Sequence, residues 1–66
     1  MKLIGHTASD IKSGETVLDR GTWFIIQEVR VSAEHGGIAF LDTEGVWHGV
    51  YHPDEYLGVE ERFTIH

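Results

Sequence analysis

The chain has 66 residues, of which 41% are apolar, and a formal net charge of −6 at pH 7. This length allows one domain, and a fold this small buries only about 60% of its unfolded surface, so we expect oligomerisation as one source of further stability. The absence of cysteine excludes a disulfide framework and thiolate metal ligands. The apolar content is too high for disorder, and no run approaches the roughly 18 apolar residues of a membrane span.

The charge balance of 11 acidic against 5 basic residues constrains the partners. Non-specific affinity for nucleic acid comes from lysine and arginine that neutralise phosphates, so the composition argues against DNA or RNA as a partner. A protein partner with a basic surface fits better. Met1–Ile4 has the beginning of a signal peptide, but Gly5 and His6 interrupt the apolar segment. We therefore expect a cytoplasmic protein without membrane association.

The first third of the chain predicts a short helical turn and a hairpin. Residues 7–10, Thr-Ala-Ser-Asp, have the spacing of a capping box, and Gly14 can end a helix, so we expect one helical turn near residues 8–13. A short strand over Glu15–Leu18 follows. Asp-Arg-Gly at residues 19–21 has the composition of a tight turn, which predicts a hairpin into the next segment.

Thr22–Ser32 is the longest β-rich run. Its first half is apolar on both faces, because Trp23 and Ile25 alternate with Phe24 and Ile26. This pattern has two interpretations. The first, which we favour, is a long bent strand that contributes to two sides of a small barrel. The second is an exposed apolar patch used for self-association, with Phe24 and Ile26 as interface residues.

Residues 38–52 predict the central hairpin of the fold. Asp42 at the first turn position and Gly45 at the last suit a type I turn followed by a left-handed glycine. This turn sets a register in which each residue of one strand has a defined partner on the other. One face then carries Ile38, Phe40, Val46, His48 and Val50, and the other carries Ala39, Leu41, Trp47, Gly49 and Tyr51. Ile38 lies opposite Val50 in this register, and a slip of one residue would exchange the two faces.

The last part of the chain predicts a 3₁₀ turn and a final strand. Pro53–Gly58 has proline first, acids in the opening turn and glycine after the end. Glu61–His66 alternates between apolar and polar residues, as a half-buried strand does.

Five strands, with the long bent strand second and a 3₁₀ turn before the last, follow the order of SH3-like small barrels. We therefore expect an all-β, five-stranded SH3-like barrel. An OB-like barrel or an open sheet completed by dimerisation is the alternative. The likeness is one of architecture alone, since no SH3 or Tudor motif matches residue by residue.

The second face of the predicted hairpin is the candidate binding surface. Ala39 and Gly49 form its floor, between the aromatic rings of Trp47 and Tyr51. Leu41 adds an apolar side chain, and Asp42 and Glu44 form an acidic rim. Aromatic faces attract ammonium and guanidinium groups by about 0.5 to 2 kcal/mol each. Such a trough suits a basic or methylated side chain, or a proline-rich segment. The alternative is that both aromatic residues pack in the core or in a dimer interface.

The histidines do not predict a metal site. On a continuous strand His48 and His52 share a face but lie about 13 Å apart at roughly 3.3 Å per residue, too far for one zinc ion with ligand bonds near 2 Å. We interpret His48 as a partly buried histidine opposite Phe40, and His52 as a turn residue bonded to nearby backbone. No metal or other cofactor is expected.

No catalytic constellation is visible either, because the chain lacks a cysteine nucleophile, a phosphate-binding glycine loop and a close Ser-His-Asp arrangement. We expect a non-catalytic protein-binding module that engages a basic or proline-containing segment or self-associates as a homodimer. One alternative is a decoy that imitates the charge of DNA, which requires an array of acids on one face, namely Asp10, Glu15, Asp19, Glu60 and Glu61. Another is stacking of single-stranded nucleic acid on Trp23, Trp47 and Tyr51.

Overall fold

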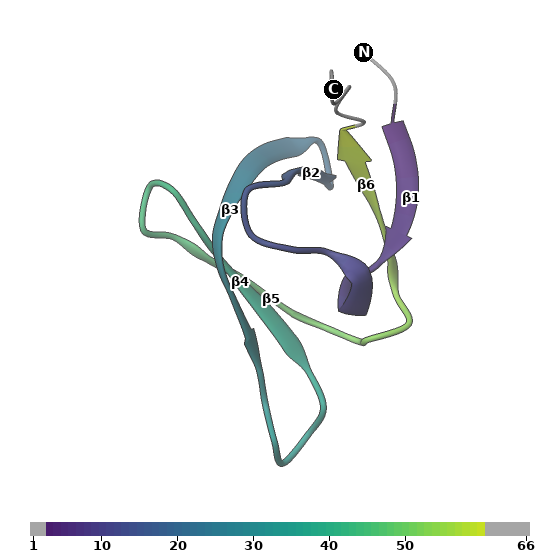
Figure 1. Ribbon diagram of the computed structural model, residues 1–66, viewed down its shortest axis with the longest axis vertical. Coiled ribbons are helices and arrows are strands. Elements are labelled where there is room, and N and C mark those ends of the chain that lie inside the picture. The colour runs from purple at the N-terminus through teal and green to yellow at the C-terminus, as the bar shows by residue number, and fades with distance from the viewer. Residues whose placement is uncertain (1–2, 61–66) are drawn as a thin grey trace, which may run out of the picture.

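The computed structural model describes residues 3–60, in which the regular structure is six β-strands and one 3₁₀ turn. The elements are β1 (Leu3–Thr7), η1 (Ala8–Asp10), β2 (Thr16–Asp19), β3 (Thr22–Val31), β4 (Ile38–Asp42), β5 (Trp47–Tyr51) and β6 (Tyr56–Glu60). They make one antiparallel six-stranded sheet in the order β1-β6-β2-β3-β4-β5 (Figure 1). The expected all-β class is confirmed. The strand predicted over Glu61–His66 lies outside the described residues.

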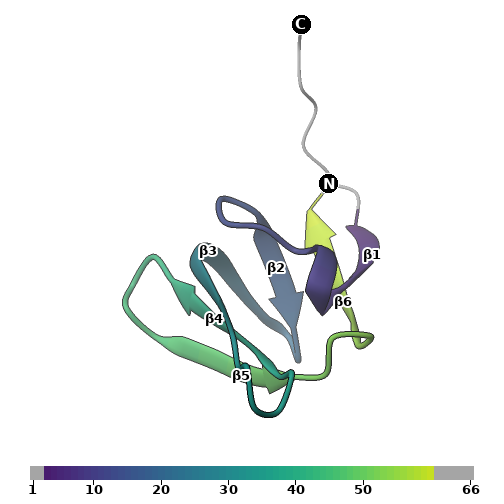
Figure 2. The same cartoon turned by 60° about the horizontal axis from the view of Figure 1, so that its bottom comes forward.

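The sheet is curled but not closed. Strands β2 to β5 are successive neighbours, and the chain then returns so that β6 pairs with β2 and β1 adds to β6. Figure 2 shows β4 and β5 on one side of β2 and β3, with β6 and β1 on the other. Within residues 3–60, β1 and β5 are therefore the two edges of the sheet.

The long strand β3 bends at a bulge, as the favoured interpretation of its sequence predicts. It pairs with β2 over Thr22–Ile25 and with β4 from Ile26 onward, and the register shifts between Ile26 and Glu28. The extra residue, Gln27, increases the local twist and bends the strand. One strand thereby serves both halves of the sheet.

The double-sided apolar start of β3 is divided between core and solvent. Phe24 and Ile26 are buried, whereas Trp23 and Ile25 are 43% and 44% exposed. An exposed apolar pair therefore exists on β3, but its members are not the two residues that the self-association interpretation assigned to an interface.

The core lies on the inner face of the curled sheet. Its members come from every described strand but β1, together with the segment around η1, and they are Ala8, Ile11, Val17, Phe24, Ile26, Ile38, Phe40, Tyr51, Leu57 and Val59. Val17 on β2 lies opposite Phe24 on one side and Val59 on the other. Full burial of side chains of this kind contributes about 1.5 to 3 kcal/mol each, so these strands are held mainly by their inward residues.

The N-terminal helical turn is shorter than predicted. It covers Ala8–Asp10, and Thr7 makes no side-chain cap bond to its backbone. Instead the Thr7 hydroxyl donates to Oδ2 of Asp10 at 2.9 Å, so the predicted capping box does not form. The turn is held from outside, because the backbone N–H of Ala8 donates to the Glu55 carbonyl at 2.8 Å.

The segment between β5 and β6 contains no 3₁₀ turn, so the prediction for Pro53–Gly58 is wrong. Pro53 and Asp54 form a simple turn, and residues from Tyr56 onward are extended. The reason lies outside the segment: β6 pairs with β1 and with β2, and its alternation buries Leu57 and Val59. Pairing and burial decide strand formation more than local start and stop signals.

Candidate functional site

The turn between β4 and β5 is organised by the Asp42 carboxylate. Its Oδ1 accepts the backbone N–H groups of Glu44 at 2.8 Å and Val46 at 2.9 Å. Its Oδ2 accepts a hydrogen bond of 2.7 Å from Nε2 of His48. Gly45 has φ +84° and donates its N–H to the Asp42 carbonyl, which confirms the predicted turn. Asp42 is thus a buried acceptor and not part of an open acidic rim.

The same hydrogen bonds lower the pKa of the Asp42 carboxyl below its usual value of 3.8. The bond from His48 is the largest cause and the bond from the Val46 N–H is the next, while burial opposes both. The His48 ring in turn stacks on Phe24, with the ring centroids 3.8 Å apart and the planes 3° from parallel. Asp42 and His48 therefore fasten the turn to β3.

The register of the hairpin agrees with the prediction near the turn and departs from it at the open end. Phe40 lies opposite His48, as predicted, but Ile38 lies opposite Tyr51 and not opposite Val50. Gly49 marks the shift, because it has φ +139° and approaches β4 so closely that an added Cβ would lie 3.0 Å from the Ile38 carbonyl oxygen. An extra residue in one strand exchanges the faces beyond it.

This shift divides the predicted binding surface. Tyr51 is 7% exposed, packs on Phe40 at a centroid distance of 5.5 Å and donates its hydroxyl to Oδ2 of Asp19 at 2.7 Å. The prediction that Tyr51 shares an exposed face with Trp47 is therefore wrong. Burial, followed by the Asp19 hydrogen bond, raises the pKa of the Tyr51 hydroxyl far above its usual value of 10.

Trp47, the other aromatic residue of the predicted surface, is exposed but already lies against a cation of the same chain. The guanidinium carbon of Arg30 lies 5.0 Å from the centre of the Trp47 ring, and Arg30 also donates to Glu28 at 2.9 Å. Ala39 and Leu41, both half-buried, lie opposite Arg30 and Glu28 on β4. The attraction of Trp47 for a positive charge is thus met within the chain.

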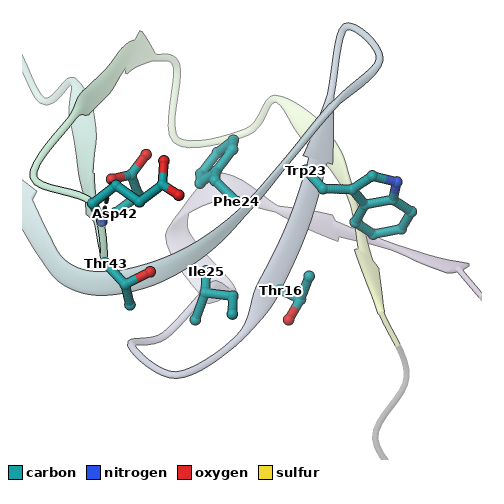
Figure 3. Close-up of a pocket in the computed structure, with 7 residues that line it drawn as sticks. Thr16, Trp23, Phe24, Ile25, Asp42 and Thr43 are labelled. Carbon is teal, nitrogen blue, oxygen red and sulfur yellow. Dashed lines mark hydrogen bonds between the residues drawn. The ribbon is translucent and has the colours of Figure 1, made fainter.

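A hollow at the other tryptophan brings aromatic and acidic residues together. It has a volume of about 280 Å³ and lies between the first half of β3 and the β4–β5 turn. We call it the Trp23 pocket, and its lining residues are Thr16, Trp23, Phe24, Ile25, Asp42, Thr43 and Glu44. Figure 3 shows Thr43, Ile25 and Thr16 in a row below β3, with Phe24 above the strand and Trp23 at the far end.

The Trp23 pocket is electrostatically one-sided. Its lining includes the carboxylates of Asp42 and Glu44 and no basic side chain. Asp42 is already engaged by three donors, whereas the Glu44 carboxylate makes no hydrogen bond or ion pair within residues 3–60. An exposed indole and an available carboxylate therefore line the same hollow.

Sequence reasoning missed this pocket because its parts are separated along the chain. Asp42 and Glu44 were assigned to the rim of a trough on β5, and Trp23 to a strand face. The signal that could have found the site is the exposed apolar side of β3, which the bulge at Gln27 brings next to the β4–β5 turn.

The environments of His48 and His52 are set by nearby residues. His48 is half-buried opposite Phe40, and Nδ1 of His52 accepts the Asp54 N–H at 3.2 Å, as expected for a turn residue. Among residues 3–60 no three side chains of the kinds that bind metals come together. No helix in this part of the chain is long and apolar enough to cross a membrane.

Fold and site together define a small all-β protein whose described residues form an open antiparallel sheet with an aromatic, acidic hollow. No family model matches the sequence, and comparisons with curated proteins and with solved structures gave no match either.

Proposed function

We propose that the protein is a non-catalytic protein-binding module whose Trp23 pocket receives a basic side chain of its partner. The observation that carries this proposal is the pairing of a 43% exposed Trp23 with the available Glu44 carboxylate in one hollow. The pocket has the same kinds of residues as the site expected from the sequence, an aromatic ring and acids, although Figure 3 shows the Trp23 indole at the end away from Asp42.

The interaction energies expected in the pocket are those of a weak binding site. A cation on an indole contributes about 0.5 to 2 kcal/mol, and an exposed ion pair adds about 0.2 to 1 kcal/mol. A single side chain would therefore bind with roughly millimolar affinity or weaker. The net charge of −6 assists by attracting basic partners from a distance. A useful affinity requires further contacts with the same partner.

A non-catalytic role is supported by the state of the acid–base pair in the site. Asp42 and His48 are the closest such pair in the described residues, and no hydroxyl is hydrogen-bonded to either. Nucleophilic catalysis needs a nucleophile within hydrogen-bond reach of the base. The donors on Asp42 and the ring stacked on His48 give both residues a structural task instead.

We also propose that β2 to β6 correspond to the five strands of an SH3-like barrel, with β1 as an addition. Two features support this correspondence: β2 to β5 follow one another, and β6 returns to β2. The Tyr51 hydroxyl bond to Asp19 also joins β5 to β2 across the core.

The pocket is tested by titration with N-acetyl-lysine methylamide and its arginine counterpart, followed through the NMR signal of the Trp23 indole N–H. We expect saturable shifts in the millimolar range. Trp23→Ala and Glu44→Gln should each weaken binding about two- to fivefold, because each removes one attraction of the size given above.

Matched controls are the other exposed tryptophan and an exposed acid elsewhere. Trp47→Ala and Glu34→Gln should leave the affinity unchanged, since Trp47 is 46% exposed but lies under Arg30, and Glu34 is in a different turn. Absence of a saturable shift at Trp23, or an equal loss of affinity in Trp47→Ala, would contradict the proposal.

A further inference from the structure

The first half of β3 has a strand on one side only. Pairing with β2 covers Thr22–Ile25, whereas pairing with β4 begins at Ile26 opposite Asp42. Within residues 3–60, no strand pairs with Trp23 on the β4 side. The Trp23 pocket lies along this uncovered stretch of edge.

The direction of the backbone groups follows from the ladder with β2. The N–H of Ile26 donates to the Glu15 carbonyl at 2.9 Å, and the Ile26 carbonyl accepts the Gly14 N–H at 2.7 Å. Ile26 therefore bonds toward β2. In an antiparallel ladder, successive residues direct their backbone groups to opposite sides. Trp23 and Ile25 accordingly direct theirs toward the pocket, in agreement with the 3.0 Å bond from the Thr43 N–H to the Ile25 carbonyl.

The β4–β5 turn leaves this edge after a single bond. Thr43 continues the line of β4 by one residue, and the chain then turns back through Glu44 and Gly45. The N–H and carbonyl of Trp23 remain next to the hollow of about 280 Å³. An uncovered edge of this kind is a template for an added strand.

We propose that an extended basic segment of the partner adds to β3 at this edge, antiparallel to it, with its basic residue directly opposite Trp23. This inference rests on the function proposed above and specifies how the partner is held. Residues opposite one another project from the same face of a sheet, so the basic side chain would lie beside the Trp23 indole. Two backbone bonds to Trp23 supply the further contacts that a single side chain lacks.

Charge distinguishes this edge from the other two. The edge strand β1 carries no acidic residue over Leu3–Thr7, and the edge strand β5 is interrupted by the register shift at Gly49. In the part of the chain that the structure describes, the β3 edge adjoins a pocket lined by two carboxylates. A second copy of the chain would bring a further charge of −6 to this edge, which favours a basic partner over self-association.

The test uses the capped tripeptide Lys-Val-Thr, which places lysine opposite Trp23 and leaves the position opposite Ile25 to Thr43, and two forms that carry one N-methyl group each. The parent should bind at least tenfold more tightly than n-butylamine, which carries the same ammonium side chain without the backbone groups that would bond to Trp23. Methylation of the lysine nitrogen removes the N–H that faces Trp23, and we expect at least a tenfold loss. Methylation of the valine nitrogen after lysine faces away from β3 and should leave the affinity within about twofold.

Amide exchange in the protein gives an independent readout. Saturation with the parent peptide should slow exchange at Trp23 and leave Phe24, which is already bonded toward β2, unchanged. If both methylated peptides bind alike, or the parent binds no better than n-butylamine, strand addition is overturned while the side-chain pocket stands. If neither the peptide nor N-acetyl-lysine methylamide binds, the proposed function itself fails. A dimeric solution mass with the Trp23 amide protected before peptide is added would assign the edge to a second copy and overturn the proposal.

Discussion

Asp42 shows how much one side chain can decide in a chain of this size. Its carboxylate accepts two backbone N–H groups of its own turn and the His48 imidazole, whose ring stacks on Phe24 of β3. Side-chain bonds of Asp to nearby backbone favour turns. The position of Glu44 in the Trp23 pocket therefore depends on a residue that does not itself offer a free acceptor to a ligand.

The lowered pKa of Asp42 predicts a loss of stability in acid. The unfolded carboxyl takes up its proton near pH 3.8, before the folded one does, so the stabilisation is present above this pH and is lost as pH falls through the lower folded pKa. We expect the urea midpoint of the wild type to fall between pH 5 and pH 3. Asp42→Asn should reduce that fall, because the group that titrates is gone.

A comparison of Asp42→Ala with Asp54→Ala at pH 7 provides the control for this prediction. Asp42→Ala removes an acceptor from three donors and should lower the midpoint well below that of Asp42→Asn, while Asp54 lies in an exposed turn. Equal midpoints for the two alanine variants would show that the Asp42 bonds do not hold the fold.

The residues that the sequence predicts correctly are those whose role is local. Asp42 and Gly45 indicate the turn by their own backbone preferences, and the turn fixes the pairing of Phe40 with His48. Tyr51 could not be placed in this way. The face of the sheet on which Tyr51 lies depends on the register shift at Gly49. That shift accompanies the close approach of Gly49 to β4, which the sequence alone does not predict.

At the scale of elements, the fold depends on two contacts that cross the sheet instead of following it. Phe24 on β3 stacks on His48 of β5, and Tyr51 at the end of β5 bonds to Asp19 at the end of β2. Strands β2 and β5 are not neighbours in the sheet order. These contacts hold the curl of the sheet and with it the shape of the Trp23 pocket.

Tyr51→Phe removes one of the two cross-sheet contacts. The loss of a buried hydrogen bond should lower the free energy of unfolding by about 1 kcal/mol, which corresponds to roughly 4 to 8 °C in Tm for a domain of this size. Thermal unfolding followed by circular dichroism measures this shift. Tyr56→Phe is the matched control and should leave Tm unchanged, since Tyr56 is 73% exposed.

The same variant has a second signature in alkali. Because the folded chain keeps the Tyr51 pKa above 10, its contribution is fully present below pH 10 and is lost as pH rises further. The wild type should therefore lose more stability between pH 9 and pH 11 than Tyr51→Phe does. Parallel losses in the two proteins would contradict the assignment.

The elements were predictable to the extent that their alternation is regular. The hairpin of β2 and β3, the bend in β3 and the hairpin of β4 and β5 follow from the sequence. Strands β1 and β6 do not, because Leu3–Thr7 and Tyr56–Glu60 become strands by pairing with each other over a long sequence separation. The Trp23 pocket could not be predicted for the same reason, because its two sides come together only when β3 is bent.

At the scale of the whole molecule, the excess of acids acts in two directions. A net charge of −6 on 66 residues opposes the compact state through self-repulsion and at the same time favours the approach of positively charged molecules, such as the partner proposed above. Three acids of the decoy alternative accept hydrogen bonds from this chain: Asp10 from Thr7, Glu15 from the Lys12 N–H, and Asp19 from Tyr51.

Salt should therefore move stability and binding in opposite directions. Between about 0.02 M and 0.5 M sodium chloride, screening weakens repulsion within the chain and attraction to a ligand alike. We expect Tm to rise by a few degrees and the affinity for N-acetyl-lysine methylamide to fall several-fold. Calorimetry and NMR titration measure the two quantities, and an affinity that does not change with salt would exclude the carboxylates from the site.

The Arg30 side chain over Trp47 gives the molecule an internal spectroscopic reference. The chain has two indoles of nearly equal exposure, but one lies beneath a guanidinium of its own and the other lines an acidic hollow. Emission from the two rings therefore reports different events. With Trp47→Phe, the remaining fluorophore reads occupancy of the pocket directly, and with Trp23→Phe it reads only the integrity of the fold.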